Sequence, residues 1–336
     1  MKEWIHTFLC REPQTAGKGA VLFPTRFDED LKEIIRQGVG GRHTLPWSSP
    51  ETYHAWKTEK IRTEFSDYWE NRFCPESQTS FEFPWLEEEE AVAFLDRAAA
   101  ERSPVLDLAS DFCMGMLPFL LRKNLVLPVC ASDLDAGTME VLAEQLQCLF
   151  PSGNVCTASF DNNDIPVRDG ALRYVTGIDA MYSTTDPDAG MDCRWSYCLH
   201  RERAVREVYR ILQPGGYFIA EEKMTECDWD LMTLWEVCGK EKLFGVLSFS
   251  QIQEVIGRMT RDQWRNVFEE TGFSVQMEKK YLRRLMPEQR KRFLLRYTGC
   301  VGQQKQIPAF PEEPDTPEDI GLEVCEGSVF YVLQKN

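Results

Sequence analysis

Long apolar runs are missing from this chain of 336 residues. No stretch approaches the roughly 18 uncharged apolar residues that a membrane-spanning helix needs. The segment Met1 to Cys10 also lacks the basic region followed by an apolar region that a secretion signal would show. We therefore expect a cytoplasmic protein that has no membrane partner.

Positive charge is scarce, since 38 Lys and Arg face 54 Asp and Glu, for a net charge of -16. Such a surface repels nucleic-acid phosphates and anionic lipids. One basic stretch, 283–296, interrupts this pattern, and an acidic, proline-containing stretch, 305–326, follows it. We interpret the pair as a basic helix and an acidic loop that attract each other. We expect no nucleic-acid partner, although an RNA contact through the basic helix is the alternative.

Ligand sets for a metal ion are also lacking. The twelve cysteines are scattered along the chain, many of them inside apolar runs, which is typical of reduced and buried thiols. The nearest approach to a ligand cluster is Cys193, Cys198 and His200, whose spacing differs from that of zinc fingers and ribbons. We expect no metal site, with a site at this cluster as the alternative.

Strand-like and helical patterns alternate from Pro104 onward, as in a parallel sheet that is covered on both faces. The expected strands are 104–109, 125–132, 154–159, 171–182, 217–221, 273–279 and 328–333. The pattern predicts an α/β protein with a Rossmann-like, doubly wound, mostly parallel seven-stranded sheet. We expect this domain to span 101–336, with insertions near 223–260 and 283–326. Residues 1–100 are rich in aromatic side chains, and we expect them to form an N-terminal helical cap with Tyr53, Tyr68 and Trp69 as possible lid residues.

Acidic residues follow three of the expected strands. Asp107 lies at the end of the first strand, Asp133 at the end of the second, and Asp161 after the third. In an open α/β sheet, ligands bind outside the carboxyl ends of the strands, and a carboxylate there can accept both hydroxyls of a ribose. The sequence therefore predicts an adenosine pocket without a phosphate-binding loop. The alternatives are a loop cap at Asp107, a solvated acid at Asp133 and an ordinary turn at Asp161 and Asn162.

Three stretches in the second half of the chain carry a family resemblance. They are Asp161–Val175 (DNNDIPVRDGALRYV), Glu207–Gly216 (EVYRILQPGG) and Trp264–Phe273 (WRNVFEETGF). In this order, with Asp133 at the end of the second strand, they resemble class I S-adenosylmethionine-dependent methyltransferases, with a type 11/25-like domain.

The resemblance implies S-adenosylmethionine as the cofactor. It also implies ten cofactor-binding residues, which are Asp107, Ala109, Ser110, Asp111, Gly115, Asp133, Leu134, Asp161, Asn162 and Gly177. The chain departs from the family in the first loop, where Ala109, Asp111 and Cys113 stand in place of glycines. Only glycine lets the backbone approach a ligand closely without steric cost.

Methyl transfer from a sulfonium is an in-line displacement, which mainly requires that the acceptor be held close to the methyl carbon. A general base would lie beyond the fourth strand, where Asp179 and His200 are our candidates. Their alternatives are a turn cap and a surface histidine. We expect a methyltransferase that acts on a small-molecule acceptor. The alternative, prompted by Asp111 and Cys113, is a catalytically inactive protein of the same fold that serves as a binding or regulatory partner.

Overall fold

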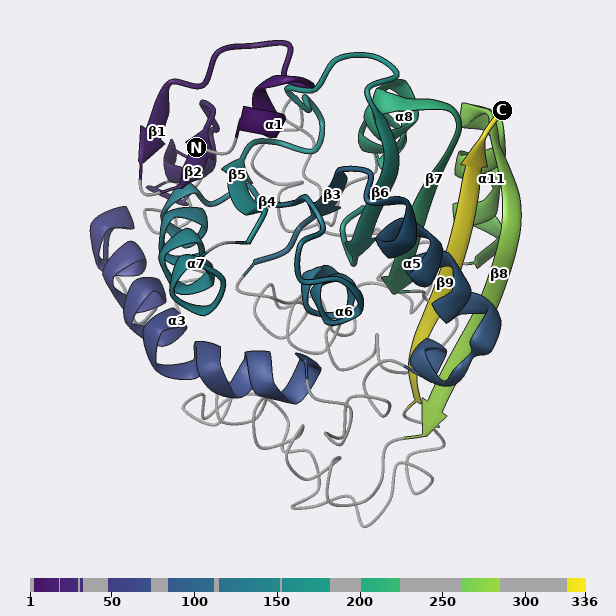
Figure 1. Ribbon diagram of the computed structural model, residues 1–336, viewed down its shortest axis with the longest axis horizontal. Helices are drawn as coiled ribbons and strands as arrows, with labels where there is room; N and C mark the ends of the chain where they lie inside the picture. Colours follow the sequence, from purple (N-terminus) through teal and green to yellow (C-terminus); the bar gives the residue numbers. More distant parts are fainter. Residues whose placement is uncertain are drawn as a thin grey trace, which may run out of the picture.

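The computed structural model of the chain describes residues 3–17, 19–29, 31–32, 48–73, 84–111, 115–151, 153–181, 201–223, 261–284 and 325–336. Its helices are α1 (Glu3–His6), α3 (Pro50–Phe73), η2 (Pro84–Glu87), α5 (Glu89–Glu101), α6 (Leu117–Lys123), α7 (Ala136–Leu149), α8 (Arg201–Ile211) and α11 (Arg261–Thr271). Its strands are β1 (Thr15–Gly17), β2 (Ala20–Leu22), β3 (Val105–Leu108), β4 (Val129–Asp133), β5 (Val155–Ser159), β6 (Leu172–Ile178), β7 (Leu212–Lys223), β8 (Phe273–Arg284) and β9 (Cys325–Lys335). Figure 1 shows the strands, which form one sheet, and the helices that lie against it.

The sheet has the order β1-β2-β5-β4-β3-β6-β7-β9-β8. Neighbouring strands from β2 to β7 run parallel, and β9 is antiparallel to both β7 and β8. The order β5-β4-β3-β6-β7 is that of a doubly wound sheet. The expected α/β fold is therefore confirmed, and the seven strands from Val105 onward match the seven that we predicted.

The N-terminal region contributes more than helices. β1 and β2 form a short hairpin, and β2 extends the sheet by pairing in parallel with β5. The expectation of a helical cap over residues 1–100 did not include these two strands, which belong to the sheet. Each has three residues, too few for an alternating pattern to show in the sequence. The division of the chain at residue 100 remains a prediction.

Apolar side chains cover both faces of the sheet. Along β9, Val329, Tyr331 and Leu333 belong to one core cluster, whereas Phe330 and Val332 belong to the other, as the two-residue period of a strand requires. The first cluster is completed by α1, α8 and α11, and the second by α3, α5, α6 and α7. Two packed helical layers therefore fix the strand ends on which the candidate site depends.

The expected long segments are only partly described. Tyr281 to Arg284 belong to β8, so the predicted basic stretch begins in a strand and not in a helix. Its remainder, most of the acidic loop 305–326 and the insertion from 224 to 260 lie outside the described residues. Within the described part of the chain, no helix has the length and apolar character needed to cross a membrane.

Candidate functional site

The strand order reverses beside β3. From β3 the chain proceeds to β4 and β5 on one side, and it then returns to the other side with β6 and β7. Such a reversal leaves a crevice outside the carboxyl ends of the strands, where ligands bind in doubly wound sheets. Leu108 and Gly177 pair at the ends of β3 and β6. The loops after these two strands therefore flank the candidate site.

Asp107 is a buried acid that holds the loop after β3. Its carboxylate accepts hydrogen bonds from the hydroxyls of Thr176 (2.7 Å) and Ser110 (2.8 Å) and from the amides of Met116 (3.1 Å) and Leu117 (3.0 Å). Burial raises the pKa of Asp107, and these four bonds oppose that shift. The described contacts give Asp107 and Ser110 the role of fixing the loop, and direct cofactor binding by either residue remains a prediction.

The loop backbone has the conformation that glycine favours. Ala109 and Asp111 have φ angles of 51° and 37°, which lie in the left-handed region where a side chain costs about 1–2 kcal/mol. Asp tolerates this region better than most residues. The loop thus keeps a glycine-like backbone at two of the three positions where the expected glycines are missing. The third position, Cys113, lies outside the described residues.

Gly115 is required by its distance from Asp107. A Cβ atom at Gly115 would lie 2.4 Å from Asp107 Oδ2, closer than any non-bonded contact allows. The carboxylate cannot withdraw easily because four donors hold it. Gly115 therefore lets the chain turn closely around Asp107, and a contact between Gly115 and cofactor remains a prediction.

Asp133 stands at the end of β4 with its carboxylate held by two backbone amides. Oδ2 accepts from the amide of Asp111 and Oδ1 from the amide of Asp135, each at 3.2 Å. Burial, followed by the nearby Asp111 charge, raises the pKa of Asp133 to about 6. Two bonds leave lone pairs on the carboxylate for further donors. The carbonyl of the next residue, Leu134, accepts from the Thr25 hydroxyl at 3.3 Å.

Helix α3 brings residues to this site that our sequence reasoning missed. Lys57 Nζ lies 2.9 Å from Asp111 Oδ1. His54 Nε2 lies 2.8 Å from Asp28 Oδ1, and its Nδ1 lies 3.5 Å from Asp135 Oδ1. The helical period of α3 predicted its helix, but it could not show which turn meets the sheet. A charged residue on an amphipathic helix is most often solvated, so the sequence contained no signal for Lys57 or His54.

The aromatic residues that we considered for a lid differ in their surroundings. Burial and the carboxylates of Asp135, Asp111 and Asp133 raise the pKa of Tyr53, so Tyr53 lies near the candidate site. Trp69 is instead a core residue, because it is 5% exposed, stacks on Phe65 and contacts Phe150. The lid expectation is wrong for Trp69 and remains a prediction for Tyr53.

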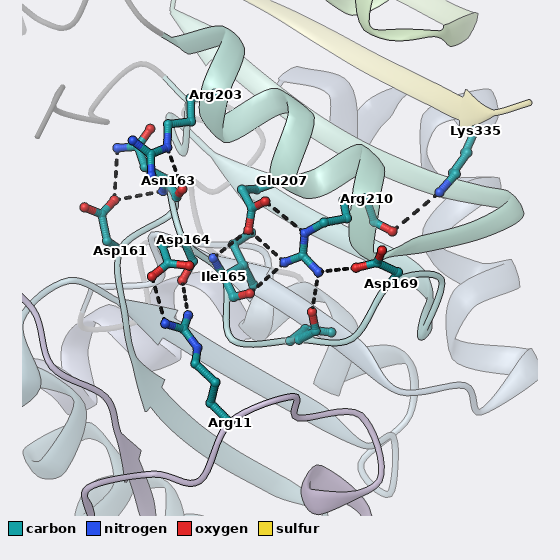
Figure 2. Close-up of polar contacts among 11 residues, drawn as sticks. Arg11, Asp161, Asn163, Asp164, Ile165, Asp169, Arg203, Glu207, Arg210 and Lys335 are labelled. Carbon is teal, nitrogen blue, oxygen red and sulfur yellow. Dashed lines mark hydrogen bonds and ion pairs between the residues drawn. The ribbon is translucent and has the colours of Figure 1, made fainter. Parts of the chain in front are cut away.

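Asp161 and Asn162 begin the loop after β5. Asp161 Oδ1 accepts from the amide (2.8 Å) and the side-chain nitrogen (3.0 Å) of Asn163, which is the pattern of an Asx turn (Figure 2). Burial raises the pKa of Asp161. Asn162 Nδ2 donates to the Ala180 carbonyl at 3.2 Å, so it joins this loop to the segment after β6. Both residues have structural contacts, and cofactor binding by either remains a prediction.

Arg210 fixes the same loop from helix α8. Figure 2 shows its guanidinium group between Glu207, Asp169 and the loop. It donates five hydrogen bonds of 2.7–2.9 Å, three of them to the Glu207 and Asp169 carboxylates and two to the carbonyls of Ile165 and Val167. Arg11, from the N-terminal segment, donates to the Asp164 carboxylate and carbonyl at 2.8 Å. The loop is thus held from two sides.

The end of β6 places Gly177 and Asp179 at the crevice. A Cβ atom at Gly177 would lie 2.6 Å from that of Ala180, so glycine is needed for this turn. Asp179 has a φ angle of 52°, and its amide donates to the Glu221 carbonyl at 2.7 Å. The neighbouring Glu222 is fully buried and accepts from the Met181 amide at 2.9 Å. Sequence reasoning selected neither glutamate, although the expected strand 217–221 ends beside them.

Two further predictions concern residues that the structure does not describe. The candidate base His200 lies outside the described residues, as do Cys193 and Cys198. Among the residues that the structure describes, no group of three or more His, Cys, Asp or Glu side chains could hold a metal ion.

Comparisons with known proteins concern the fold alone. No family model matches this chain, and no curated protein matches it. Solved structures with a similar fold include the YcgJ protein from Bacillus subtilis (15% identity, TM-score 0.48, 74% of this chain and 99% of that one). A candidate methyltransferase from Bacillus halodurans has 17% identity and a TM-score of 0.48 over 73% of this chain and 98% of that one. An S-adenosylmethionine-dependent methyltransferase from Methanosarcina mazei has 12% identity and a TM-score of 0.42 over 69% of this chain and 92% of that one.

Proposed function

We propose that this chain is an S-adenosylmethionine-dependent methyltransferase that acts on a small-molecule acceptor. The observation on which the proposal rests is the Asp133 carboxylate, which two backbone amides orient at the carboxyl edge of the sheet, beside the strand-order reversal. In doubly wound folds a carboxylate at this place binds the two hydroxyls of a ribose.

The residues at this edge of the sheet fit such a cofactor. Asp133 would hold the ribose, and the loop from Ala109 to Asp111, whose backbone is left-handed at both of these residues, would lie beside the methionine moiety. The segment at Asp161 and Asn162 would lie beside the adenine. When bound, S-adenosylmethionine supplies a methyl group on a sulfonium leaving group, so that an in-line displacement needs no metal ion.

The chain's own residues would position the acceptor and remove its proton. Asp179, just after β6, is our candidate general base, because it stands at the crevice and is partly exposed. Its left-handed backbone and the hydrogen bond from its amide to the Glu221 carbonyl fix the backbone from which the side chain projects. His200 remains a second candidate.

The catalytically inactive alternative was prompted by Asp111 and Cys113. Asp111 keeps the glycine-like backbone, and its side chain is paired with Lys57 of α3. This arrangement supports cofactor binding. Turnover of the cofactor with any acceptor would exclude the inactive alternative.

Calorimetric titration with S-adenosylmethionine and S-adenosylhomocysteine tests the proposal. We expect binding to the unmodified protein, and a loss of roughly tenfold or more in affinity for Asp133→Ala, because a hydrogen bond to a charged group contributes about 1.5–3 kcal/mol. Asp96→Ala is the matched control, since Asp96 pairs with Lys123 on the surface of α5. Absence of binding to the unmodified protein, or equal affinity for both variants, would contradict the proposal.

A further inference from the structure

Three carboxylates gather where α3 faces the ends of β3 and β4. Asp133 accepts from the amides of both Asp111 and Asp135, so the three acids occupy adjoining positions. Neighbouring carboxylates disfavour each other's ionised form. Accordingly the Asp111 and Asp135 charges add to burial in raising the pKa of Asp133 to about 6. A ribose diol, however, needs an ionised carboxylate as acceptor.

Helix α3 supplies the groups that face these acids. Lys57 Nζ lies 2.9 Å from Asp111 Oδ1, its side chain is 16% exposed, and its charge lowers the pKa of Asp133. One turn earlier, His54 lies between Asp28 and Asp135. Tyr53 stays neutral in this field because its pKa is raised. Lys57 thus pairs with an acid of this site from a distant part of the chain.

We propose that Lys57 is a positioning residue of the nucleoside site: its ammonium group holds the Asp111 side chain toward α3 and offsets one of the three crowded charges. Asp133 thereby remains ionised and able to accept a ribose diol. This inference rests on the proposed function, because it assigns a role at the same site. It also explains how an aspartate can occupy a glycine position, since its backbone adopts the left-handed conformation while its side chain pairs with α3.

The pH dependence of ligand binding provides the readout. Above the Asp133 pKa of about 6, affinity should be constant, and below it affinity should fall by up to about tenfold per pH unit, because protonation must be reversed before binding. We call the pH at which affinity begins to fall the break. Removing the Lys57 charge with Lys57→Met should move this break to higher pH. Removing the Asp111 charge with Asp111→Asn should move it to lower pH.

The experiment is titration of the full chain with S-adenosylhomocysteine, whose amino and carboxyl groups keep their charges between about pH 5 and about pH 7.5. At about pH 6 we expect Lys57→Met to weaken binding about threefold or more relative to the unmodified protein. Lys57→Arg should restore the normal profile. The double variant Lys57→Met/Asp111→Asn should place the break between those of the two single variants. Lys60→Met, one turn along α3 and paired with Glu64, is the control.

Opposite shifts from the two single variants support the inference, since a merely structural role for Lys57 would not produce them. An unshifted break in Lys57→Met, with normal binding by the unmodified protein, overturns the inference and leaves the proposed function standing. No binding to the unmodified protein at any pH overturns both.

Discussion

Strained backbone at single residues marks the loops that form the candidate site. Ala109, Asp111 and Asp179 all have left-handed φ angles, and all three follow strands that end at the crevice. Such residues persist only where the surrounding contacts impose the conformation. At Ala109 and Asp111 those contacts include two hydrogen bonds: the Ser110 amide donates to the Ser132 carbonyl, and the Asp111 amide donates to the Asp133 carboxylate.

Relief of this strain is testable at Ala109. We expect Ala109→Gly to raise the free energy of unfolding by up to about 1 kcal/mol, because the left-handed penalty outweighs the extra entropy of glycine in the unfolded chain. Ala100→Gly, at an exposed position in α5, should instead cost about 1 kcal/mol. Urea denaturation measures both changes in the free energy of unfolding. A comparable loss of stability in the two variants would contradict the assignment of backbone strain to Ala109.

Asp179 can be tested without disturbing its backbone. Asn tolerates the left-handed region as Asp does, so Asp179→Asn should leave cofactor affinity unchanged. Turnover should fall by about 100-fold or more if Asp179 is the base. The measurement is product formation at saturating cofactor once an acceptor is found, and unchanged turnover would remove Asp179 from the mechanism.

Elements rather than single residues decide how much the sequence could reveal. The strands from Val105 onward were predictable because their apolar runs alternate with helical patterns, and Asp133 was predictable because it stands at the end of a strand. β1 and β2 were not predictable, because three residues show no period and because the pairing of β2 with β5 joins segments more than a hundred residues apart. Lys57 was missed for a related reason, since its contact with Asp111 joins distant segments.

The contact between α8 and the loop after β5 makes a prediction at this scale. Arg210→Lys keeps the charge but cannot replace the five donated bonds. We expect it to lower the free energy of unfolding by about 2–4 kcal/mol. Arg206→Lys, at an exposed pair with Glu202 on the same helix, should change it by less than about 0.5 kcal/mol. Equal effects in denaturant titration would show that the Arg210 contacts contribute little.

The whole molecule depends on its N-terminal segment as part of the sheet domain. Ile5, Phe8, Val21 and Phe23 belong to the same core cluster as β3, α8 and α11. The segment also reaches the loop after β5, since Leu9 bridges to Val167 and Arg11 pairs with Asp164. The first residues of the chain therefore support one wall of the candidate site.

Because the N-terminal segment shares its core with the sheet, we predict a single unfolding transition. Phe8→Ala should lower the free energy of unfolding by about 3–5 kcal/mol and shift the whole transition. Leu125→Ala, at a side chain that is 50% exposed, should have little effect. A separate early transition in Phe8→Ala, detected by comparing circular dichroism with tryptophan fluorescence, would show that the N-terminal segment unfolds independently of the sheet.

A crystal structure of the protein with S-adenosylhomocysteine tests the central claim most directly. We expect the nucleoside at the carboxyl ends of β3 and β4, with both ribose hydroxyls within hydrogen-bonding distance of Asp133 and with Lys57 still paired to Asp111. Density for the nucleoside elsewhere, or a ribose that makes no contact with Asp133, would contradict the account.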